Sequence, residues 1–188
     1  LGFRSTLAEN FDFRASASNG FSLPNSSSKY DPNVNLDPVE LWQYEAGFNY
    51  KKSEKFEADV VAFILNTSKE IVEFPPGSGI LINSGKTTRM GIESQASVNV
   101  TDAIKLTGTF SYIETEIKES VDESLTGKEL TGIPKTIGTF DVAYTSPLGF
   151  GARFRIRDVG SYFVSQTNGS SYEGYTVANM NFYYNFNK

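Results

Sequence analysis

The sequence predicts an all-β fold, an antiparallel transmembrane β-barrel segment of about nine strands. Three observations support this: polar and apolar residues alternate along most of the 188 residues, connections are alternately short and long, and aromatic residues recur near the strand ends. Successive side chains on a strand point to opposite faces, so alternation produces one apolar and one polar face. Membrane barrels have short periplasmic turns and long extracellular loops, whereas a soluble sandwich has no reason to place its long loops at one end.

The clearest strand pair begins at Leu41. Even positions from Trp42 to Tyr50 are apolar or aromatic, and odd positions are mostly polar. After a polar turn, the even positions from Phe56 to Ile64 are again apolar, with Glu57 and Asp59 opposite. This unit of strand, short turn, strand and long loop recurs along the chain.

The same reasoning places the other strands and loops. A charged stretch after Tyr112 has no sustained apolar face at helical spacing and is therefore interpreted as a loop. We expect strands at residues 1–7, 11–18, 41–50, 56–64, 90–100, 104–112, 136–144, 150–157 and 175–186, and long loops at residues 19–38, 66–86, 114–128 and 164–174.

Composition excludes several functional classes. The chain has no cysteine and no histidine, which removes disulfides, thiolate or imidazole metal sites and histidine-dependent triads. The net charge of −5 is spread along the chain and does not suggest a nucleic-acid partner. No apolar run is long enough for a membrane-spanning helix, and no signal peptide is visible. We expect no enzymatic activity, no cofactor and no resident metal.

Several short motifs, in order, resemble the barrel of TonB-dependent outer-membrane receptors. Residues 19–24 are similar to the family's G-F-R-A-P segment, and residues 35–48 to its N-P-x-L-x-P-E…Y-E-x-G stretch. The resemblance continues through the remaining motifs, Asn83-Ser84-Gly85-Lys86 with Gly91-Ile92-Glu93, Pro134-Lys135 and Gly174-Tyr175-Thr176. It covers essentially the whole chain.

The sequence also departs from the family pattern. Val39 stands where the family has glutamate, and Ser22-Leu23 replace an Arg-Ala pair. Nothing resembles the N-terminal plug or the segment that binds TonB, and the expected strand number is odd, whereas bacterial barrels are usually even. Residues 1–188 are therefore interpreted as part of a single barrel domain, a fragment from the later part of a 22-strand receptor.

The resemblance implies an energy-coupled uptake receptor in the outer membrane of a Gram-negative bacterium. Its partners would be outer-membrane lipid, the plug domain, TonB and a small-molecule metal chelate. An iron chelate (siderophore) is expected because that substrate is common in the family, with cobalamin and other scarce nutrients as alternatives.

Candidate ligand contacts lie on the polar strand face and in the long loops. Arg153, Arg155 and Arg157 share one face and could attract an anionic chelate, because arginine pairs well with carboxylates. They could instead pair with Glu93, with Asp141 or with carboxylates of the plug. Ligand sites also use aromatic walls, which makes the loop residues candidates: Tyr30, Phe74 and Tyr172, with Tyr162 and Phe163 nearby.

The apolar face is expected to contact lipid, with an aromatic girdle near the strand ends. Its predicted members are Trp42, Tyr44, Phe48, Tyr50, Phe110, Tyr112, Phe154 and Tyr184.

Two other classes stay open from the residues alone. One is a complete eight-stranded outer-membrane barrel with a structural or adhesion role. The other is a soluble β-sandwich binding module, which predicts that Trp42, Phe48, Phe110 and Phe154 face a dry core.

Overall fold

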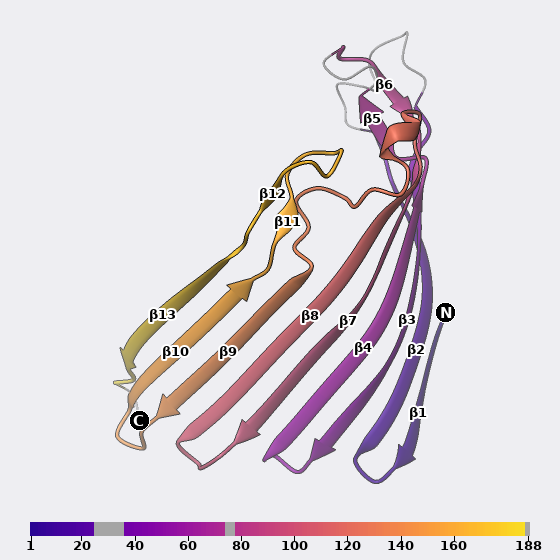
Figure 1. Ribbon diagram of the computed structural model, residues 1–188. Coiled ribbons are helices and arrows are strands. Elements are labelled where there is room, and N and C mark those ends of the chain that lie inside the picture. The colour runs from indigo at the N-terminus through magenta and orange to yellow at the C-terminus, as the bar shows by residue number, and fades with distance from the viewer. Residues whose placement is uncertain (25–35, 74–77, 187–188) are drawn as a thin grey trace.

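The fold is one curved antiparallel sheet of nine long strands in sequence order (Figure 1). The computed structural model describes residues 1–24, 36–73 and 78–186. The strands of this sheet are β1 (Gly2–Ala8), β2 (Phe11–Ser22), β3 (Val39–Lys52), β4 (Phe56–Ser68), β7 (Lys86–Asn99), β8 (Ile104–Glu119), β9 (Thr136–Thr145), β10 (Phe150–Val159) and β13 (Tyr175–Tyr184).

Short turns join the strands at one end of the sheet and long connections at the other (Figure 1). The long connections carry two small hairpins, β5 (Ile71–Glu73) with β6 (Leu81–Asn83) and β11 (Tyr162–Phe163) with β12 (Ser171–Tyr172). A 3₁₀ turn, η1 (Glu123–Leu125), lies between β8 and β9. Within the described part of the chain, no helix is long and apolar enough to cross a membrane.

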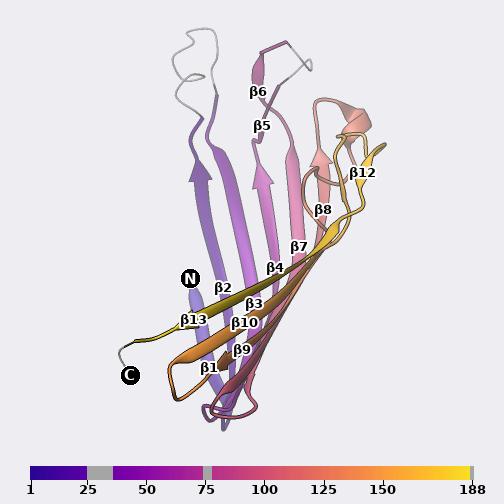
Figure 2. The same cartoon turned by 90° about the vertical axis from the view of Figure 1, so that its left-hand side faces the viewer.

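The sheet bends so that β10 and β13 cross in front of β3 and β4 in the view of Figure 2. β1 and β13 form the two edges, and no ladder joins them among the described residues. The predicted nine-stranded antiparallel sheet is thus confirmed, as an open sheet rather than a closed eight-stranded barrel.

Strand register divides the side chains between two faces. Residues directly opposite each other in an antiparallel pair lie on the same face. One continuous row runs through Phe13, Phe48, Val60, Ser94 and Phe110, and belongs to the apolar face. The adjacent row contains Asp12, Asn49, Asp59, Gln95 and Thr109 and belongs to the polar face.

The apolar face is uncovered within this single sheet. Trp42 and Phe110 are 48% and 49% exposed, and Phe48 and Phe154 are 45% and 37% exposed. No large side chain among the described residues is fully buried. The soluble sandwich hypothesis is therefore wrong, because it requires these four aromatics in a dry core between two sheets.

Several predicted boundaries are wrong, mostly because pairing continues further toward the long-loop end. The stretch after Tyr112, predicted as a loop, continues β8 to Glu119, where Glu116 still pairs with Thr88 of β7. In this segment Glu114, Glu116 and Lys118 lie on one face of the strand. Ile113, Thr115 and Ile117 lie on the other face, so the two-residue period of the strand continues. The remaining differences are the extension of β2, β3, β4, β7 and β10 by a few residues, the β5–β6 hairpin inside the predicted loop 66–86, and an earlier end of β13 at Tyr184.

An aromatic ring joins the edge strand β13 to β10, its neighbour, and to β9 beyond it. Thr145, Gly151 and Tyr183 lie in one row across β9, β10 and β13. The Tyr183 ring lies over Gly151, where a Cβ would overlap it, and its hydroxyl is 3.0 Å from Thr145 Oγ1. Only a glycine leaves room for this arrangement.

Replacement of Gly151 by alanine is expected to displace the Tyr183 ring and to break its hydrogen bond to Thr145. The cost is about 1 kcal/mol for the hydrogen bond alone. Urea unfolding of the complete protein in detergent, monitored by tyrosine fluorescence, measures it. Thr145→Val, which removes the same hydrogen bond without the steric clash, should cost less; an equal or larger cost would contradict the role of Gly151.

Candidate functional site

The concave side of the sheet is polar. A hollow of about 420 Å³ is lined by Arg4, Asp12, Arg14, Asn49, Glu57, Asp59 and Gln95, all on the polar face. Arg14 donates two hydrogen bonds to Asp59, at 2.6 and 2.7 Å. Its row neighbour on β3 is Gly47, so no side chain blocks its path across that strand. Arg4 pairs with Asp12 at 2.7 Å.

The three predicted arginines lie on the same polar face of β10, but they are not equivalent. Asp141 of β9 accepts a hydrogen bond from Arg155 Nε at 2.8 Å and forms an ion pair with Arg153 Nε at 3.1 Å. Asp141 is only 6% exposed, because the two guanidinium groups cover it. Two of the three arginines thus have the carboxylate partner that the sequence left open, while Glu93 forms no ion pair with them.

Arg157 differs from Arg153 and Arg155. It forms no ion pair with any residue of the described ranges, and its neighbours across the sheet are Thr139 and Val177. One row nearer the loops, Val159 pairs with Tyr175 on the same face. Arg157 therefore lies on the polar face close to the loop end, with its charge uncompensated by this part of the chain.

Three tyrosines form a cluster above Arg157. Tyr162 and Tyr172 face each other across the β11–β12 hairpin with ring centroids 5.3 Å apart. Tyr175 meets the Tyr172 ring edge-on at 6.4 Å. Of the predicted aromatic ligand contacts, Tyr172 belongs to this cluster, whereas Tyr30 and Phe74 lie outside the described residues.

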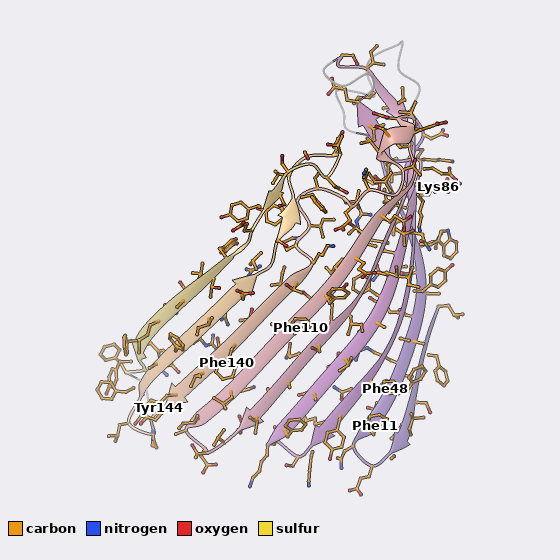
Figure 3. The ribbon with its side chains drawn as sticks, viewed as in Figure 1. Phe11, Phe48, Lys86, Phe110, Phe140 and Tyr144 are labelled. Carbon is orange, nitrogen blue, oxygen red and sulfur yellow. The ribbon has the colours of Figure 1, made fainter. Side chains whose placement is uncertain are left out.

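All eight predicted girdle residues lie on the opposite, apolar face. The pairing registers place Trp42, Tyr44, Phe48 and Tyr50 together on β3, and Phe154 and Tyr184 join them from β10 and β13. Figure 3 labels two of the eight, Phe48 and Phe110, and three further aromatic residues of this face, Phe11, Phe140 and Tyr144.

The concave face also carries an apolar patch that was not predicted from the sequence. β4 is apolar on both faces above Val60, so Val61, Phe63 and Leu65 point inward. Phe63 lies over Gly91 of β7, where a Cβ would be 3.1 Å from the ring. The continuous apolar run from Val60 to Leu65 is the signal that could have revealed it, because such runs indicate strands covered on both sides.

Among the described residues, no cluster of three potential metal-ligating side chains is present. The described strands present a polar face, with Arg157 below the tyrosine cluster, and an apolar opposite face. Such a division into a polar and an apolar face is typical of the wall of a transmembrane β-barrel.

Comparison with known proteins gives the family. The model for TonB dependent receptor-like β-barrels matches residues 1–188, and the chain belongs to this family. Proteins of this family are transport receptors in the outer membrane of Gram-negative bacteria, not enzymes. The prediction from the sequence motifs is thereby confirmed.

Individual relatives are more distant. The metal-pseudopaline receptor CntO of Pseudomonas aeruginosa is 26% identical over 129 residues, covering 64% of this chain and 18% of the receptor. The unliganded ferric citrate transporter FecA superimposes with a TM-score of 0.80 at 19% identity, over 100% of this chain and 30% of the transporter. The siderophore receptor PiuA from Acinetobacter baumannii also gives 0.80, at 17% identity, over 100% of this chain and 29% of that receptor. The chain thus spans less than a third of each.

Proposed function

We propose that this chain is a sector of the single barrel domain of a TonB-dependent outer-membrane receptor that imports an anionic metal chelate, such as a ferric siderophore. The observation that supports the substrate class is Arg157, which faces the concave side without an ion-pair partner in the described chain. Arginine binds carboxylates and similar planar anions through paired, charge-assisted hydrogen bonds.

The tyrosine cluster supports the same substrate class. Tyr172 lies at the loop end, and its ring contacts that of Tyr175. Tyr175 lies in the row next to Arg157. A chelate entering from the loops would meet aromatic surfaces first and the guanidinium group next. Arg153 and Arg155, both held by Asp141, would contribute a weaker, partly neutralised field further along the wall.

The remaining partners follow from membership of the family. The concave polar face would surround the plug domain, which TonB pulls using the proton gradient across the inner membrane. The apolar face, with its girdle of aromatic side chains, would contact outer-membrane lipid.

Replacement of Arg157 by glutamine is expected to weaken binding of anionic chelates about ten- to a hundredfold, because one charge-assisted hydrogen bond is lost. The measurement is equilibrium binding of radiolabelled ferric citrate and ferric catecholates to the complete protein in detergent, with uncharged cobalamin as a control ligand.

Arg153→Gln is the matched control, because Asp141 already pairs with that side chain. It should change affinity for the same chelates by less than about threefold. Equal losses of affinity in the Arg157 and Arg153 variants would contradict a specific role of Arg157 in binding. Binding of cobalamin alone would overturn the anionic substrate class while leaving the receptor assignment intact.

A further inference from the structure

Four long connections meet at the loop end of the sheet, and asparagine side chains join two pairs of them. Asn83, at the end of β6, accepts a hydrogen bond from the Asp37 backbone N–H at 2.6 Å and donates one to the Asp37 carbonyl at 3.0 Å. Asn168, in the β10–β13 connection, repeats this arrangement with Glu129 of the β8–β9 connection, at 2.7 and 3.0 Å.

Each side chain therefore acts as one unit of a β-ladder. A primary amide presents a donor and an acceptor side by side, which is the pattern that a backbone residue presents to a neighbouring strand. Asn83 also donates to the Lys69 carbonyl at 2.8 Å, so it joins Asp37 to both ends of its own connection.

Other contacts link the two pairs of connections to each other. The Val121 N–H donates to Ser84 Oγ at 2.8 Å, which joins the β8–β9 connection to the β4–β7 connection. Lys69 Nζ contacts Glu40 at 2.8 Å and Asp37 at 3.7 Å. The hydrogen bond to Glu40 raises the pKa of the Lys69 ammonium above its usual range.

We infer that Asn83 and Asn168 are latches that help to join the four connections into one loop collar, comprising residues 36–38, 69–73 with 78–85, 120–135 and 160–174. The collar should respond as a unit, so that loosening one connection loosens its neighbour. Ligand entry and release would then depend on the whole collar. That last step rests on the proposed function, whereas the coupling itself does not.

The backbone conformation of Asn168 favours asparagine at this position. Its φ of +59° is left-handed, a conformation that asparagine adopts more readily than most residues. Glycine would accept this backbone but would lose the latch. Asn168→Gly therefore removes the side-chain contacts without adding backbone strain.

Hydrogen exchange measured by mass spectrometry on the complete, ligand-free protein tests the coupling. Asn83→Ala should accelerate exchange of the Asp37 amide about tenfold, the effect of one lost hydrogen bond. The decisive readout is the Val121 amide, whose acceptor Ser84 adjoins Asn83 in the chain. If the collar is one unit, that amide exchanges faster too.

Three further variants complete the test. Asn83→Leu is similar in size to asparagine but lacks both the donor and the acceptor, and should give the same pattern as Asn83→Ala. Asn168→Gly should expose the Glu129 amide, and the Gly132 amide, which donates to the Phe163 carbonyl at 2.9 Å between the same two connections, should then exchange faster as well. Asn99→Ala removes a comparable 2.6 Å bond to the Glu54 carbonyl at the opposite end of the sheet and should leave all loop amides unchanged.

Acceleration confined to Asp37 would reduce Asn83 to a local contact and overturn the collar. Unchanged exchange in all latch variants would do the same. Coupled exchange together with an absence of chelate binding would support the collar and contradict the proposed function.

Discussion

Replacement of Phe110 by arginine is expected to destabilise the complete protein by about 2–4 kcal/mol, the cost of a charged residue at the middle of a lipid-facing strand. Phe110 lies on the apolar face of β8 and is 49% exposed within the sheet. Outward residues of this strand are apolar from Ile104 to Tyr112 and become charged at Glu114, so Phe110 stands inside the apolar band.

Thr109→Arg is the control for this change, because the neighbouring side chain points to the opposite face. Thr109 lies in the polar row with Gln95 and Thr139, where a solvated arginine is tolerated. Unfolding in urea, from detergent micelles and from liposomes, compares the two variants. Equal destabilisation would show that the apolar face does not contact lipid.

Replacement of Gly174 by alanine is expected to cost roughly 2–5 kcal/mol, from left-handed strain and overpacking together. Gly174 has a φ of +88° directly before β13. A Cβ there would overlap the Val159 carbonyl oxygen and lie 2.8 Å from the carbonyl carbon of Gly160. Both atoms belong to the backbone, so a side-chain rotation cannot relieve the overlap.

Substitutions at two other glycines allow the backbone strain and the steric overlap to be measured separately. Gly132 has a φ of +74°, and a Cβ added there would meet nothing within 4 Å, so Gly132→Ala measures the backbone strain alone. Gly138 has ordinary backbone angles and equal open space, so Gly138→Ala should be nearly neutral. Folding yield and heat-modifiable gel mobility rank the three variants. A Gly174→Ala variant no worse than Gly132→Ala would contradict the steric argument.

Alternation was sufficient to predict the strands and the two faces. The side-chain period of a strand is two residues, so a sequence such as Phe150–Arg157 assigns its own faces before any partner is known. The same local logic placed Trp42, Tyr44 and Phe48 on one face, in agreement with the registers. Strand ends were less predictable, because the segment after Tyr112 is held in the sheet by β7 rather than by its own composition.

Local alternation and the ordered motifs were enough to assign the class of this protein: a single sheet, polar on one face and apolar on the other, from one receptor family. Which charges and amides meet could be seen only in the folded chain. Arg153, Arg155 and Arg157 look alike in the sequence, yet Asp141 pairs with two of them and not with the third. Asn83 and Asn168 likewise find backbone partners 46 and 39 residues away. Such pairings depend on strand register and loop closure, which local spacing does not encode.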